Sequence, residues 1–258
     1  MKKTYTRKLK HLFKVVLMCI CLFLFNSGCG LDVYYVVEAP SYSIHTPYYD
    51  SEFSNCYFSF RTNENNNNTE VKKFLGTAIY YKIYKSKSKM DSEVGSITSL
   101  INSTDNKANA APRMTSTYNF KTLKAENLSG SVLIEHSDRE DQEIYIRLTD
   151  YIGSDGNVVD AYKAEIRIGS VSYGKPLRDE DGLNFNFASY RKDEKSAVPK
   201  EGDSDVQENP TSTDSDDDNR WYVPLFAVGL SLNDDYTNTS SVPLYLGCVT
   251  IKDNEEDN

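Results

Sequence analysis

The run from Trp221 to Leu232, WYVPLFAVGLSL, constrains this chain more than any other stretch. Its twelve residues are apolar on both alternating faces, which is typical of a strand that is buried on both sides. Such a strand lies in the middle of a sheet. We therefore expect a central strand at 221–232, with a bend at Gly229.

Shorter runs with an apolar residue at every second position predict further strands. In 143–148, for example, Ile144, Ile146 and Leu148 point to one side. One dry face and one wet face indicate antiparallel sheets that are half exposed. A tight turn at 154–157 contains Asp-Gly and favours a hairpin between two of these strands. The predicted strands are 55–61, 73–85, 131–135, 143–148, 162–168, 183–187, 221–232 and 242–252, with 31–38 as a first strand or an extended tether.

One segment departs from the strand pattern. In 91–102 the residues Val94, Ile97 and Ile101 recur at helical spacing, which predicts a short amphipathic helix on the edge of a sheet. The fold class expected from these patterns is all-β, a single antiparallel β-sandwich of residues 55–252. Two small β domains divided near Gly130 are the structural alternative.

The segment 192–219 differs in composition from its surroundings. It holds ten acidic residues between Asp193 and Asp218, only two lysines there, and no aromatic residue. A segment of this kind buries too little apolar surface to offset its loss of conformational entropy. We expect a disordered acidic insertion at 192–219, and an acidic tail at 253–258.

The N-terminal 28 residues have the layout of a secretory signal peptide. Six basic residues and no acid precede an apolar run of eleven residues from Val15 to Phe25, which is too short to span a membrane. After this run comes Ser27-Gly28-Cys29, which resembles the lipobox of bacterial lipoproteins, although Asn26 replaces the usual aliphatic residue. The resemblance implies acylation of Cys29, a lipidated lead-in over 29–54, and a partner in the membrane itself.

Charge excludes one class of partner. Without the leader the chain has 23 basic and 38 acidic residues and a net charge of −15. Binding of nucleic acid needs a basic footprint, so we expect none. After the leader, which contains Cys19 and Cys21, the cysteines besides Cys29 are Cys56 and Cys248, an even pair in an exported chain. We expect either a disulfide between them or two buried free thiols.

No motif for a catalytic, cofactor or metal site occurs in the sequence. His45 and His136 lie in polar or proline-flanked stretches without a triad pattern, and we interpret both as surface residues. The acidic run at 214–219 lacks the glycine and glutamate of a calcium-binding loop. Tyr80, Tyr84 and Tyr145 fall on the outer faces of predicted strands, where they could bind a partner, but we expect them mainly to pack under the helix and loops.

Two family resemblances add to these expectations. The pattern Gly76-Thr77-Ala78-Ile79-Tyr80-Tyr81 is similar to one that is frequent in fibronectin-type-III-like and immunoglobulin-like sandwiches. The pieces CGLD, FSFRTN, GTAIYYKIY and VPLYLGCVTI resemble uncharacterised lipoproteins of Treponema-type spirochaetes, which implies no catalytic residues.

Together the sequence predicts a non-enzymatic lipoprotein, without a cofactor. It would be held in the cell membrane or outer membrane and face the periplasm or the exterior. There it would bind a protein or glycan partner or serve in envelope structure. A lipid-anchored hydrolase that uses carboxylates is the alternative.

Overall fold

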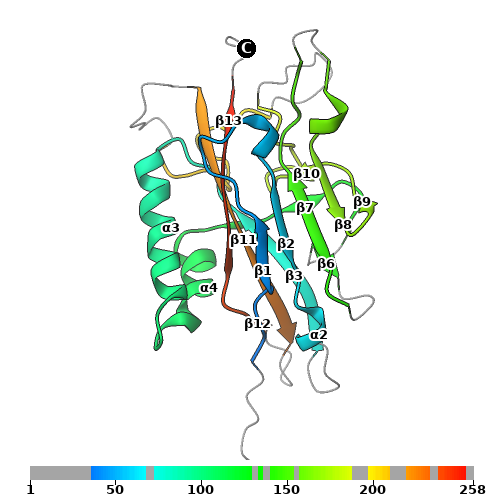
Figure 1. Cartoon of the computed structure of the whole chain (residues 1–258). Coiled ribbons are helices and arrows are strands. Elements are labelled where there is room, and N and C mark those ends of the chain that lie inside the picture. Colours follow the sequence, from blue (N-terminus) through cyan, green and yellow to red (C-terminus); the bar gives the residue numbers. More distant parts are fainter. Residues whose placement is uncertain are drawn as a thin grey trace, which may run out of the picture. The chain divides into compact units, whose positions relative to one another are not determined.

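The computed structural model describes residues 36–67, 73–129, 133–135, 140–153, 157–187, 197–209, 219–232 and 238–253. These residues belong to one compact unit that starts at Val36. They form mostly antiparallel strands with a few helices, so the predicted all-β fold class is confirmed. Figure 1 shows the elements in chain order. The predicted signal peptide and Cys29 lie outside the described residues.

The strands are short at the edges of the fold and long at its centre. They are β1 (Tyr42–His45), β2 (Phe58–Arg61), β3 (Lys73–Tyr81), β4 (Lys121–Thr122), β5 (Lys124–Ala125), β6 (Ile134–Glu135), β7 (Glu143–Arg147), β8 (Glu165–Ile168), β9 (Val171–Ser172), β10 (Pro176–Leu177), β11 (Arg220–Leu232), β12 (Asn238–Ser240) and β13 (Leu244–Lys252). The helices are α2 (Glu64–Asn67), α3 (Lys87–Ile101) and α4 (Ala110–Pro112), with short helical turns η1 (Phe53–Asn55), η2 (Lys107–Asn109), η3 (Arg113–Thr117) and η4 (Asp160–Tyr162).

The strands form two main antiparallel sheets. Sheet 1 has the order β1-β2-β7-β8-β9. In sheet 2, β11 pairs with β3 along one edge and with β13 and β12 along the other, and β4 and β6 pair with β3. The predicted central strand is therefore confirmed, because β11 is buried along most of its length between two partner strands.

The two sheets share one hydrophobic core. Phe58, Phe60 and Ile146 of sheet 1 are fully buried, and they belong to the same cluster as Ile79 and Leu225 of sheet 2. Since these residues lie on both sides of Gly130, the alternative of two separate domains is wrong. The predicted alternation is confirmed in β2, β3 and β7, where every second side chain enters this core.

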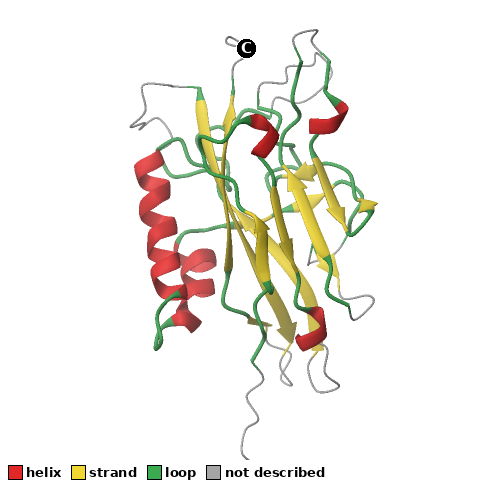
Figure 2. Cartoon of the chain, viewed as in Figure 1, coloured by secondary structure: helices red, strands yellow, loops and turns green. Residues whose placement is uncertain are grey.

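Helix α3 covers the other face of sheet 2 (Figure 2). It begins at Lys87, four residues before the predicted start, because the Ser86 hydroxyl caps the backbone N–H of Lys89. Met90, Val94 and Ile97 pack in a second cluster with Phe226. The helix thus lies on the face of sheet 2 rather than on its edge, and sheet 2 is buried on both sides.

A buried polar group fixes α3 to the sheet. Glu93, 5% exposed, accepts a bond from the Lys82 ammonium at 3.1 Å and one from the Tyr84 hydroxyl at 2.7 Å. Burial raises the pKa of Tyr84, and the Glu93 carboxylate raises it further. The hydroxyl therefore stays protonated and remains a donor.

The N-terminal segment 36–50 is part of the fold. Val37 and Pro47 are buried, and Asn67 exchanges two hydrogen bonds with the backbone of Glu38, at 2.8 and 3.0 Å. At Gly229 an added Cβ would lie 2.9 Å from the Glu38 carbonyl oxygen. The predicted domain start at Asn55 is wrong, because β1 already forms an edge of sheet 1.

The acidic segment is ordered over 197–209. Asp205 is fully buried, Val206 is 7% exposed, and the backbone of Ile83 bonds to Asp205 and Gln207 on either side of Val206. The prediction of disorder is wrong for these residues. The remainder of 192–219, apart from Asn219, lies outside the described residues.

The physical reason is a buried ion cluster. Arg178 has no exposed surface and donates to Asp205 through Nε at 2.9 Å and through Nη2 at 2.6 Å. Its Nη2 also donates to Asp203 at 2.7 Å, and the Tyr81 hydroxyl donates to Asp205 at 2.5 Å. Burial alone would lower the pKa of Arg178, but Asp205 and Asp203 raise it above its usual value.

Two further sequence expectations differ from the structure. Residues 183–187 form no named strand and only Asn184 makes a bridge, although Phe185 and Phe187 are buried in the core. The predicted turn at 154–157 lies outside the described residues except for Asn157. Strands β7 and β8 on either side of it do pair antiparallel, as expected.

Candidate functional site

The two remaining cysteines are free thiols and form no disulfide with each other. Cys56 packs against the core between the sheets, and its Sγ donates to the carbonyls of Ser51 and Glu52. Cys248 is buried in the cluster under α3, on the other face of sheet 2. Of the two alternatives, the structure has the free thiols. Burial raises the pKa of both, which makes them poor nucleophiles.

Of the two histidines considered in the sequence, the structure describes only His45. His136 lies outside the described residues. His45 ends β1, where its Nε2 lies 3.0 Å from the Asn55 carbonyl oxygen and its ring stacks on Tyr57 with 3.9 Å between centroids. Neither contact involves an acid or a nucleophile.

The His45–Tyr57 pair starts a stack of planar side chains across sheet 1. Tyr57 stacks on Tyr145 at 5.1 Å, and the Arg167 guanidinium lies 4.3 Å from the Tyr145 ring centre. Because the rings face one another, their faces are already occupied. Tyr145 therefore serves packing within the sheet more than contact with a partner.

A buried arginine completes this end of sheet 1. Arg147 is 2% exposed, and its guanidinium donates to the carbonyls of Phe53 at 2.6 Å and Ser54 at 3.0 Å. It also lies 5.2 Å from the ring centres of Phe53 and Tyr162. Within the described part of the chain, no carboxylate forms an ion pair with Arg147, so carbonyls and aromatic rings balance its charge.

The other two tyrosines pack as expected. Tyr84 is fully buried under α3, and Tyr80 is partly buried against the same cluster. The expectation that these rings pack under the helix is confirmed.

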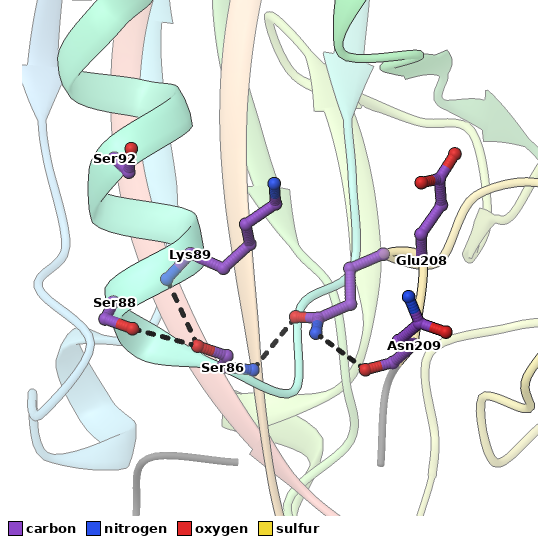
Figure 3. A pocket seen from close by; sticks show the side chains of 7 residues that line it. Ser86, Ser88, Lys89, Ser92, Glu208 and Asn209 are labelled. Atoms are coloured by element: carbon purple, nitrogen blue, oxygen red, sulfur yellow. Dashed lines mark hydrogen bonds between the residues drawn. The ribbon is translucent and has the colours of Figure 1, made fainter. Parts of the chain in front are cut away.

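An open polar hollow lies at the start of α3, with a volume of about 470 Å³. Figure 3 shows its two walls, the first turns of α3 and the ordered part of the acidic segment. The hollow exists because the ion cluster around Arg178 holds 197–209 beside β3. Its lining residues are Ser86, Ser88, Lys89, Ser92, Gln207, Glu208 and Asn209.

Internal hydrogen bonds hold the hollow open. The Gln207 Oε1 accepts from the backbone N–H groups of Lys85 and Ser86, both at 2.9 Å, which joins the two walls. The Ser86 and Ser88 hydroxyls lie 3.2 Å apart. Lys89 reaches away to pair with Glu93 at 3.1 Å.

The chemistry of the hollow is that of a polar contact surface. It offers hydroxyl, amide, ammonium and carboxylate groups, of which only those of Ser86 and Gln207 belong to buried residues, and it has no aromatic lining residue. Such groups can hydrogen-bond the polar part of a peptide or a carbohydrate. This site could not be expected from the sequence, because Gln207, Glu208 and Asn209 fall in a segment that composition assigned to disorder.

Three absences hold for the part of the chain that the structure describes. No group of three or more His, Cys, Asp or Glu side chains there could hold a metal ion. No helix among these residues is long and apolar enough to cross a membrane. Asp205 is buried, Asp203 is partly buried, and both are bonded to Arg178, so this pair gives no support to a carboxylate-dependent hydrolase.

The large apolar side chains that are exposed gather in one segment. Of the six in the described residues, five belong to 36–49 and one, Val171, to β9. Tyr48 is 70% exposed, Val36 67%, Tyr42 53% and Ile44 45%. In β1 the exposed Tyr42 and Ile44 alternate with the half-buried Ser43 and His45, and the pairing with β2 has an irregularity between Ser43 and His45.

Comparisons with protein-family models, with curated proteins and with solved structures found no match for this chain.

Proposed function

We propose that this chain is a bacterial lipoprotein, acylated at Cys29, that holds a non-enzymatic β domain at the cell membrane or outer membrane, on the periplasmic or exterior side. The observation that carries the proposal is the leader, with its basic start, its short apolar run and Gly28-Cys29. Two or more acyl chains on Cys29 would give stable anchoring without a spanning helix.

The start of the folded unit supports the proposal. The two clusters of buried core residues that the structure describes begin at Phe58, well after the proposed cleavage site. Cleavage before Cys29 would leave all of these residues in the anchored chain.

The finer fold assignment that we propose is a sandwich of the fibronectin-III or immunoglobulin kind. Strands β3, β11 and β13 succeed one another with β11 in the centre, as strands C, F and G do in those folds. Strands β1, β2 and β7 correspond in the same way to A, B and E. Helix α3 and the segment 197–209 are additions to that plan.

The partner that we propose is a protein or a glycan that contacts the polar hollow at the start of α3. Ser92 lines the hollow, whereas Ser99 is exposed two turns further along the same helix. A photo-cross-linking residue at position 92 should capture a protein partner in cells, and the same residue at 99 should not. Ser92→Trp, but not Ser99→Trp, should abolish binding to a glycan array if the partner is a glycan. Equal results at both positions in both assays would rule out the hollow.

Metabolic labelling with palmitate tests the anchor. Wild type and Cys56→Ala should incorporate label to the same extent, and Cys29→Ala should incorporate none. Equal labelling of Cys29→Ala would refute acylation at this residue.

A further inference from the structure

The N-terminal segment carries exposed apolar side chains that are available for contact with a partner. We define the N-terminal apolar strip as Val36, Tyr42, Ile44 and Tyr48, each at least 45% exposed. Apolar side chains that gather on one part of a surface mark an interaction site more often than scattered ones do. Tyr49 is left out of the strip because it packs on Tyr222 and under Lys87.

The backbone that carries the strip is held in place. The Ser41 N–H donates to the Arg61 carbonyl at 2.9 Å, and the Cys248 N–H donates to the Pro47 carbonyl at 3.2 Å. At Gly247, with φ +116°, an added Cβ would lie 2.6 Å from the Pro47 oxygen. The strip side chains therefore point outward from a fixed support, and a partner would meet them without first ordering the segment.

The low charge of segment 36–49 indicates what kind of partner it contacts. Charged residues make up 26% of the whole chain, but 36–49 contains one acid, Glu38, and no lysine or arginine. A segment with this composition can enter a weakly polar environment with little cost of desolvation. Tyrosine, with an apolar ring and a polar hydroxyl, is enriched where a membrane meets water.

Chain length brings the strip to the bilayer. Val36 is seven residues after Cys29, and a fully extended chain of that length spans about 25 Å at most. We propose that the strip rests in the headgroup region of the bilayer that holds Cys29, so that the β1 side of the domain lies on the membrane. This inference rests on the proposed acylation of Cys29.

The experiment uses the full acylated chain in phosphatidylcholine vesicles, with and without bromine on the acyl chains. Tyr42→Trp and Tyr48→Trp report from the strip, and Val171→Trp is the matched control, since Val171 is exposed on β9. Wild type gives the baseline because its single tryptophan, Trp221, is 5% exposed in the core.

The expected result is that both strip reporters lose about half or more of their added emission in brominated vesicles, as a side chain at the headgroup boundary should. Val171→Trp should keep its emission. Adding anionic lipid should not increase the quenching, because the strip has no basic residue and the chain is acidic overall.

Vesicle flotation separates the two proposals. A chain that floats while its strip reporters stay unquenched overturns the strip and keeps the anchor. Emission that changes with protein density instead of bromine assigns the strip to a second copy of the chain, and it overturns the inference too. Failure of wild type to float removes the anchor, and the strip proposal falls with it.

Discussion

Asp205→Asn is the substitution that most directly tests the buried ion cluster. The change keeps the size of the side chain but replaces one acceptor oxygen by an amide group. In the wild type both Asp205 oxygens accept, at 2.9 and 2.6 Å from Arg178 and at 2.5 Å from the Tyr81 hydroxyl. In the variant at least one of these donors meets another donor.

The expected loss of stability depends on the contacts that Arg178 keeps in the variant. Removing one partner of a buried ion pair costs about 3–5 kcal/mol, because the other charge stays buried. Asp203 still accepts from Arg178 at 2.7 Å, so we expect the low end, about 3 kcal/mol. That is a large part of the ~5–15 kcal/mol by which a domain is stable.

The assay is urea unfolding of the chain without the leader and with Cys29→Ser. The fluorescence of Trp221 monitors the unfolding. Arg178→Met and the double variant complete a cycle. Each single change already breaks the same contact. We therefore expect the double variant to lose about 2 kcal/mol less stability than the two single losses added together. A loss below ~1 kcal/mol for Asp205→Asn, or strict additivity, would contradict the role given to this cluster.

Three further predictions concern other parts of the fold. Glu64 is 3% exposed, and burial with the charge of Asp141 raises its pKa from 4.5 to about 7. Since the folded state holds this proton more tightly than the unfolded state, stability should fall as the pH rises from about 5 to 8. Glu64→Gln should remove that fall and be more stable than wild type by about 1–2 kcal/mol at pH 8, with little difference at pH 5 in urea titrations; a parallel pH profile would refute this. Gly247→Ala should lower stability by about 2 kcal/mol or more, because its Cβ would meet the Pro47 oxygen at 2.6 Å. Gly95→Ala, at an exposed position of α3 with nothing within 4 Å, should raise stability by about 0.5–1 kcal/mol. Thermal melts compare the two, and a similar shift for both would be inconsistent with the close approach. Thiol titration of the folded Cys29→Ser chain without the leader, which carries Cys19 and Cys21, should label Cys56 before Cys248, which is buried under α3. Denaturation should expose two thiols without a reductant, and fewer than two would reveal a disulfide.

Elements whose burial repeats along the chain could be predicted from sequence. Strand β11 is apolar on both faces because the shared core lies on one side and helix α3 on the other, and this arrangement leaves a direct pattern in 221–232. Strands β3 and β7 leave the period-two pattern for the same reason. Their partners follow less directly, since register depends on contacts across the chain.

The acidic segment shows where composition fails. The contacts that order it join Asp205 to Arg178, 27 residues away, and to Tyr81, 124 residues away. An average over 192–219 cannot detect one aspartate with a partner so distant. The cysteines illustrate the same limit, because an even number of thiols says nothing about which face of a sheet each one occupies.

The contacts of segment 36–50 also determine how the domain would bear mechanical load. Under the proposed acylation of Cys29, a pull on the anchor would reach the described part of the chain at Val36 and then β1. A pull along β1 would load its hydrogen bonds to β2 together in shear, because bonds between antiparallel strands lie across the strand direction. The close contacts at Gly229 and Gly247 brace the same stretch against sliding. Strand β1 would thus bear the force that is applied through the N-terminal segment, so that this force does not reach the core.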